Sequence, residues 1–139
     1  MINSGLLNFM SRTKKLMIAI LRQPLYDQWE EYTWLESGQM SRKLAKGLKS
    51  LVLRDEAHVG LISRNCRKWV IADLAIMMSG YLSVPFFPSL NGEELEFLFY
   101  FGDVGLLFIG KIETKYNINR KIPKDLPQIT FHFSRDFLG

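Results

Sequence analysis

Cysteine and long apolar runs are what this sequence most clearly lacks. Cys66 is the only cysteine among 139 residues, so no disulfide can form within one chain and nothing indicates an oxidising compartment. No apolar run approaches the roughly 20 residues that a membrane-spanning helix needs. The run nearest the N-terminus, residues 16–21, lacks the small-residue cleavage pattern of a secretory signal. We therefore expect a cytoplasmic protein, with peripheral membrane contact left open.

The residue sets that hold metals or carry out nucleophilic catalysis are also missing. One cysteine and two histidines, His58 and His132, cannot supply the closed ligand set of a zinc site. Cys66 falls in the first turn of a predicted helix, but a cysteine nucleophile needs a histidine base near it. His58 begins a predicted strand and His132 lies near the far end of the chain. We interpret Cys66 as a small core residue.

Neither familiar phosphate loop is present. The chain contains no GxxxxGK[ST] segment, and the turn at residues 63–68 has no glycine through which backbone amides could approach a pyrophosphate. Arg64, Arg67 and Lys68 cluster at a predicted helix N-terminus, where an anion is favoured. A weak anion site is conceivable there, but charged loops are common and a solvated basic turn is the preferred interpretation.

Asp73 is the one charged residue in an otherwise apolar helical segment at residues 69–78. A buried carboxylate is costly unless it is paired or hydrogen-bonded, so we expect a structural bond to a backbone amide or a nearby arginine. Acid–base chemistry would need a second acid facing it, and none is evident. The sequence therefore predicts no catalytic, cofactor-binding or metal-ligating residue in this chain.

The net charge of +4 belongs to the start of the chain. Residues 1–26 hold four basic side chains and no acid, whereas the remaining 14 basic residues are balanced by 14 acids. A nucleic-acid binder would carry a basic face on its folded body, so we expect no nucleic-acid partner. We name residues 1–24 the leader and predict that it forms a basic amphipathic helix, which Pro24 interrupts. It either packs against another part of a larger protein, the more frequent role, or contacts a membrane through residues 1–22.

The rest of the chain alternates between strand and helix patterns. We expect strands at 58–62, 82–87, 106–109 and 128–133, and helices at 41–51, 66–79 and 92–101. Ser41, Asn65 and Asn91 are the expected helix caps, and Pro85 should restrict its strand to an end or a bulge. The spacing between strands is too long for hairpins and indicates βαβ units. The predicted class is α/β with a mostly parallel sheet.

An ordered series of short motifs runs along the chain. These are YTW at 32–34, RKLAKGL at 42–48, VGLISRN at 59–65, KWVIADLAI at 68–76, GYLSVP at 80–85, FP at 87–88, GDV at 102–104 and LFI at 107–109. In order and spacing they resemble the opening of the AMP-forming acyl-CoA synthetases, and are most similar to their long-chain fatty-acid ligases. The resemblance covers about residues 23–133.

The resemblance implies a parent enzyme that uses ATP and magnesium to form an acyl-adenylate and then passes the acyl group to coenzyme A. The family's phosphate loop, nucleotide contacts, magnesium-binding glutamate and C-terminal lysine lie further along, so no catalytic residue carries over. We expect residues 25–139 to be part of an incomplete N-terminal α/β subdomain, with the remainder of the parent enzyme as its partner and a fatty acid as substrate of the intact enzyme. We expect the chain alone to bind no cofactor, to be inactive and to self-associate.

Two alternatives stay open: a stand-alone interaction module acting through the leader, and a small nucleotide-binding domain. Two features depart from the family pattern. Where the family usually has glycine-containing turns, this chain has Val52 and Glu56, so a different backbone geometry is expected there. Phe97, Phe99, Tyr100 and Phe101 form a bulky aromatic set, for which packing is the default interpretation.

Overall fold

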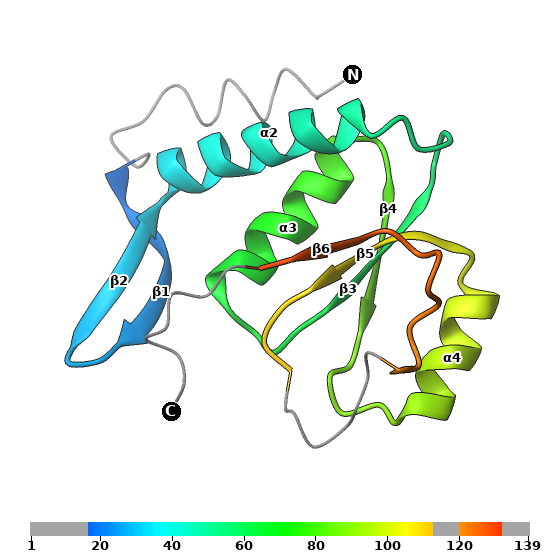
Figure 1. Cartoon of the computed structure of the whole chain (residues 1–139). Coiled ribbons are helices and arrows are strands. Elements are labelled where there is room, and N and C mark those ends of the chain that lie inside the picture. Colours follow the sequence, from blue (N-terminus) through cyan, green and yellow to red (C-terminus); the bar gives the residue numbers. More distant parts are fainter. Residues whose placement is uncertain (1–16, 113–119, 132–139) are drawn as a thin grey trace.

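The computed structural model describes residues 17–112 and 120–131, which form a β-hairpin followed by a four-stranded sheet with helices on both faces (Figure 1). The elements, in order, are β1 (Ala19–Leu25), β2 (Gln28–Thr33), α2 (Trp34–Ser50), β3 (His58–Ile62), α3 (Arg67–Met78), β4 (Leu82–Phe86), α4 (Gly92–Phe101), β5 (Val104–Ile109) and β6 (Gln128–Thr130). Among these residues, no helix combines the length and the apolarity needed to cross a membrane.

The larger sheet confirms the predicted α/β class. Its strand order is β4-β3-β5-β6, and every neighbouring pair is parallel. Pro85 sits inside β4, in register with Leu61, rather than at an end or a bulge. Because β4 is an edge strand with β3 on one side only, a proline can face away from the ladder without removing a bond.

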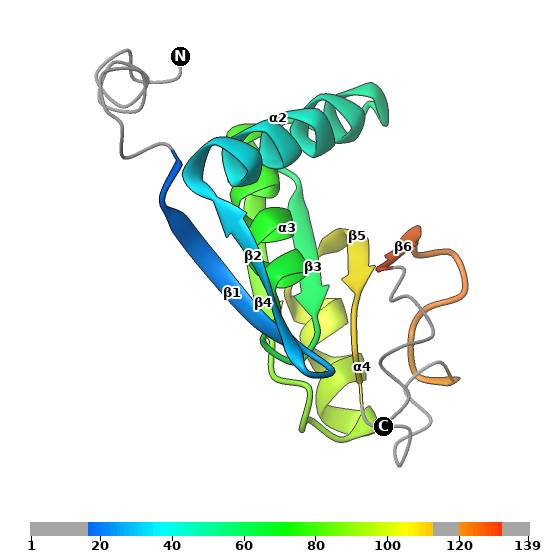
Figure 2. The ribbon, with the colours of Figure 1, turned by 90° about the vertical axis from the view of Figure 1, so that its left-hand side faces the viewer.

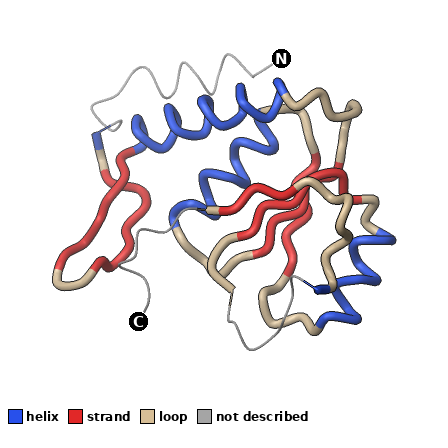
Figure 3. The backbone as a smooth tube through the Cα atoms, viewed as in Figure 1, coloured by secondary structure: helices blue, strands red, loops and turns tan. Residues whose placement is uncertain are grey.

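Two apolar cores lie on opposite faces of this sheet. Figures 1 and 2 show the helices that cover these faces. Successive residues of a strand point to opposite faces, so Val59 and Leu61 pack with α2 and α3 while Ile62 and Leu107 pack with α4. The central strands are therefore apolar on both sides, as expected for a covered parallel sheet. The trace in Figure 3 shows α2 lying across α3.

Two of the three predicted helix caps are wrong. α2 begins at Trp34, seven residues before the expected Ser41, because Thr33 and Glu36 form a capping box that satisfies the first free amides. Ser41 is buried in mid-helix. The cap position of α3 is Cys66 rather than Asn65. Asn91 does cap α4, whose bounds match the prediction.

The leader prediction is wrong where it can be checked. Residues from Ala19 onward form a strand paired antiparallel with β2, and Pro24 lies within that strand opposite Trp29. Half-buried and exposed residues alternate along β1, which is the period of a strand and not of a helix. β1 also runs across the expected division at residue 24. Residues 1–16 of the predicted helix lie outside the described residues.

Candidate functional site

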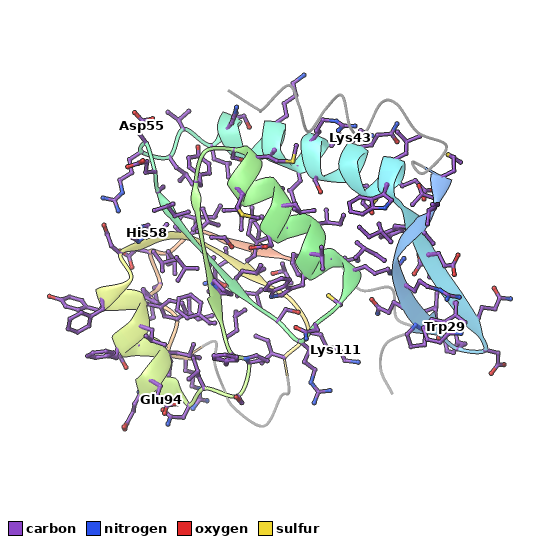
Figure 4. All side chains as sticks on the ribbon, turned by 180° about the vertical axis from the view of Figure 1, so that it is seen from behind. Trp29, Lys43, Asp55, His58, Glu94 and Lys111 are labelled. Atoms are coloured by element: carbon purple, nitrogen blue, oxygen red, sulfur yellow. The ribbon has the colours of Figure 1, made fainter. Side chains whose placement is uncertain are left out.

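The carboxyl ends of β3 and β5 are the place where an open parallel sheet usually binds a ligand. The chain leaves β3 toward β4 on one side, then returns past β3 to β5 on the other, so the connections diverge between these two strands. Ser63 and Arg64 follow β3, and Gly110 and Lys111 follow β5. Figure 4 shows Lys111 at this end of the sheet and His58 at the opposite end.

The two loops at this edge are bonded to each other. The Arg64 amide donates to the Lys111 carbonyl at 2.8 Å. The buried Ser63 hydroxyl accepts from the Lys111 amide at 3.0 Å and donates to the Arg64 carbonyl at 2.8 Å. A Cβ atom added to Gly110 would collide with Ser63, so a side chain cannot be accommodated there. These amides therefore stabilise the loops rather than form a cradle for phosphate.

The N-terminus of α3 is occupied by the hairpin. Arg67 is only 6% exposed; its guanidinium forms an ion pair with Glu30 of β2 and lies 4.1 Å from the centre of the Tyr32 ring. Its amide donates to the Gln23 side-chain oxygen at 3.2 Å. The prediction of a solvated basic turn is wrong for this residue, because the chain's own carboxylate and amide oxygens take the place that an anion would fill. The Nε and Nη1 atoms of Arg67 are buried and bond to no described group.

Cys66 and His58 do not form a catalytic pair. Cys66 is a free, half-buried thiol at the cap position of α3, beside the carboxyl end of β3. His58 begins β3, and its Nδ1 contacts the Gly102 carbonyl at the end of α4. His132 lies outside the described residues. Within residues 17–112 and 120–131, no group of three or more histidine, cysteine or acidic side chains could hold a metal.

Asp73 has a structural partner, although not the predicted one. The hydroxyl of Ser83 on β4 donates to its Oδ1 at 2.6 Å, whereas an amide or an arginine was expected. The side chain is half-buried, so a neutral hydroxyl partner is enough to compensate for its desolvation. This bond joins α3 to the edge strand β4.

The turn between α2 and β3 contains two residues in an unusual backbone conformation. Val52 and Glu56 adopt φ angles of 52° and 54°, in the left-handed region that favours glycine. Two residues with side chains therefore occupy conformations that glycine adopts more easily.

A shallow hollow on α4 is the feature that sequence reasoning left without a function. It measures about 400 Å³ and is lined by Leu90, Glu93, Glu94, Phe97 and Leu98. The aromatic set was visible in the sequence, but a pattern of apolar residues does not say which of them are buried. The hollow therefore combines an apolar lining with the carboxylates of Glu93 and Glu94.

The family model for AMP-binding enzymes matches residues 12–136. Among curated relatives, Long chain acyl-CoA synthetase 4 of Arabidopsis thaliana is 28% identical over 81 residues, and Fatty acyl-CoA synthetase B of Dictyostelium discoideum is 30% identical over 82 residues. Each alignment covers 58% of this chain and 12% of the relative, so the matched region is a small part of the relatives' length.

Solved structures show the same fold. The O-succinylbenzoate coenzyme A synthetase of Bacillus subtilis, in complex with AMP, matches with a TM-score of 0.70 and 19% identity over 90% of this chain and 30% of its own. The anthranilate CoA ligase AuaEII, in complex with anthranoyl-AMP, matches with a TM-score of 0.72 and 20% identity over 91% of this chain and 24% of its own.

Proposed function

This chain belongs to the family of AMP-binding enzymes, and from that premise we propose that it is the N-terminal portion of a long-chain fatty-acid–CoA ligase. The observation that carries the proposal is the family match over residues 12–136 together with curated relatives that are named as long-chain and fatty acyl-CoA synthetases. The chain covers 12% of those relatives, so ligase activity is proposed for the intact enzyme and not for this piece.

The bonding of the described loops supports the proposal that this piece alone binds no ATP, magnesium or coenzyme A. The loops after β3 and β5 bond to each other, and Glu30 and Gln23 fill the N-terminus of α3. Phosphoryl chemistry needs oriented donors and a metal aimed at developing charge, and no cluster of three or more histidine, cysteine or acidic side chains among the described residues offers a metal site. The proposed role of this piece is to supply the parallel sheet and its two cores, on which the rest of the enzyme is built.

The decisive measurement is ATP-dependent formation of acyl-adenylate and acyl-CoA from palmitate. We expect no turnover by the chain alone. Mixing it with the remaining part of the parent enzyme, produced separately, should restore acyl-CoA formation from a long-chain fatty acid. Turnover by the chain alone would refute the scaffold role. Restored activity with a short or aromatic acid, but not with palmitate, would refute the long-chain assignment.

A second proposed role is interaction through the start of the chain. Met17 and Ile18 are both exposed next to the basic residues that precede them. An apolar and basic segment of this kind suits an anionic membrane surface or an acidic protein surface. A cytoplasmic protein that binds membranes peripherally would then sediment with phosphatidylserine vesicles at low salt, and much less at high salt. A truncation for this test should stop at residue 16, because Ala19 begins β1.

A further inference from the structure

The outer face of α4 is apolar but has no partner among the described residues. Leu95 and Phe99 face the sheet, whereas Phe97, Tyr100 and Phe101 point outward with 58%, 84% and 68% of their surface exposed. Their rings touch one another, with centroids 4.2 Å apart for Phe97 and Phe101 and 5.8 Å apart for Tyr100 and Phe101. A contiguous aromatic patch of this kind marks an interaction surface more often than a free one.

The patch has an acidic border. The hollow of about 400 Å³ lies between Leu90 and Phe97 and is flanked by Glu93 and Glu94. Glu94 accepts from the Asn91 amide at 2.9 Å as part of the helix cap, and Glu96 is paired with Lys121 at 3.4 Å. No ion pair among the described residues neutralises Glu93. An occupant should therefore combine apolar side chains with positive charge.

The start of the sequence has that chemistry. Residues 1–16 hold Arg12, Lys14 and Lys15 with no acid, and they include the apolar residues Leu6, Leu7, Phe9 and Met10. We propose that residues 1–16, the part of the leader that precedes β1, dock from one copy of this chain on the α4 patch of a second copy, with their apolar side chains on the aromatic rings and their basic side chains facing Glu93 and Glu94.

A second copy is favoured over the chain's own leader by the layout of the fold. The Trp34 amide at the start of α2 donates to the Ile18 carbonyl, so the chain just after residues 1–16 lies beside α2. α2 and α3 cover one face of the sheet and α4 covers the other (Figure 2). A leader would have to wrap around the edge of its own sheet to reach α4, whereas a neighbouring copy can approach α4 directly.

Two different surfaces meet in this contact. Two copies can exchange it reciprocally in a closed two-fold dimer, and without such closure it builds larger rings or open chains. The charged border should make association depend on salt, since exposed charges are screened within about 10 Å at 0.1 M ionic strength. The aromatic patch should retain part of the affinity at high salt because apolar burial is not screened.

Sedimentation equilibrium of the full chain, at low and high salt, tests the proposal. We expect association that weakens with salt and is lost in a chain lacking residues 1–16. Glu93→Lys should weaken it by about tenfold, which corresponds to about 1.4 kcal/mol. Adding Lys14→Glu and Lys15→Glu to Glu93→Lys should restore it, because the two charge reversals compensate. Phe101→Ser should weaken association at all salt concentrations, and circular dichroism would check that α4 persists.

Lys43→Glu is the matched control, because Lys43 is an exposed lysine on the far side of the sheet from α4 (Figure 4). It should leave association unchanged. Equal association with and without residues 1–16 would overturn the proposal. A Glu93→Lys variant that associates as strongly as the original chain would also overturn it. The same holds if the triple variant associates no more strongly than Glu93→Lys alone. Binding of phosphatidylserine vesicles through residues 1–16, without self-association, would assign the leader to a membrane instead.

Discussion

The guanidinium carbon of Arg67 lies 4.1 Å from the centre of the Tyr32 ring, and this contact holds the β1–β2 hairpin on the first turn of α3. Glu30, two residues before Tyr32 on the same strand, forms an ion pair with the same guanidinium. The two strand residues share one side of β2, since side chains alternate along a strand. The sequence favoured a solvated basic turn here, with a weak anion site as the alternative, but the basic side chain of Arg67 is used for tertiary structure.

Arg67→Met should therefore destabilise the protein although it removes a charge from an apolar environment. It takes away a stacked cation and leaves Glu30 without its partner, and we expect a loss of about 2 kcal/mol because Glu30 is only partly exposed. Arg67→Lys should recover only part of the loss, since lysine lacks the planar group that stacks on an aromatic ring. Urea unfolding followed by circular dichroism gives the free energies.

Arg22→Met is the matched control for that prediction. Arg22 also pairs with a β2 carboxylate, Glu31 at 2.5 Å, and lies 5.3 Å from the centre of the Trp29 ring, but its side chain is 59% exposed whereas that of Arg67 is 6% exposed. Exposed ion pairs contribute about 0–1 kcal/mol. Equal losses for the two variants would show that the burial of Arg67 has no energetic consequence.

Replacing Val52 with glycine should stabilise the protein. The left-handed conformation at φ 52° costs a β-branched residue about 1–2 kcal/mol, and the 86% exposed side chain contributes little packing. Part of the gain is offset by the greater freedom of glycine in the unfolded chain, so a net increase of about 0.5–1 kcal/mol is expected. Glu56→Gly, at φ 54°, should change stability in the same direction. Thermal and urea unfolding both measure the effect.

Gly80→Ala provides the converse test. Gly80 has a φ of 83°, and a Cβ added there would meet nothing within 4 Å, so any cost comes from the backbone and not from a collision. We expect a loss of about 1 kcal/mol. If Val52→Gly destabilised the protein while Gly80→Ala had no effect, backbone strain would not explain the stability of either turn.

The bond between Asp73 and Ser83 can be measured by a double-mutant cycle. The variants are Asp73→Asn, Ser83→Ala and their combination, each assayed by urea unfolding. A hydrogen bond to a charged acceptor at 2.6 Å should give a coupling free energy of about 1–2 kcal/mol. Additive losses would mean that the two side chains act independently.

The elements that sequence reasoning placed well are those with local, redundant patterns. The strand at residues 58–62 and the helix at 92–101 match β3 and α4 because apolar residues, caps and flanking turns all agreed. β1 was missed because Leu21 and its apolar neighbours suit either period over so short a run, and the partner strand decided between them. The periodicity of residues 19–25 alone carries no information about β2, the strand with which they pair.

The burial of Arg67 could not be predicted for a related reason. Its partners, Glu30 and Tyr32, lie more than thirty residues earlier in the chain and meet it only after the hairpin has packed on α3. The resemblance to a family agreed with the α/β fold, but it assigned no role to this arginine. The sequence likewise showed that α4 is rich in aromatic residues, but not which of them are exposed. The burial of Leu95 and Phe99 in the structure identifies the exposed side of the helix.

The capping box of α2 predicts a specific response to acid. The backbone amide of Thr33 donates to the Glu36 carboxylate at 2.8 Å and its hydroxyl donates at 2.9 Å, and these bonds lower the pKa of Glu36 below its ordinary value. A carboxyl whose pKa is lower in the folded state contributes stability above its unfolded pKa and loses it as the pH falls through the folded pKa. Glu36→Gln keeps a hydrogen-bond acceptor in the box but cannot titrate. Stability measured by urea unfolding from neutral pH down to pH 3 should therefore fall less steeply in Glu36→Gln than in the original chain. The two slopes should differ only in the acid range. Identical pH profiles would show that this carboxylate does not contribute to the acid sensitivity of the fold.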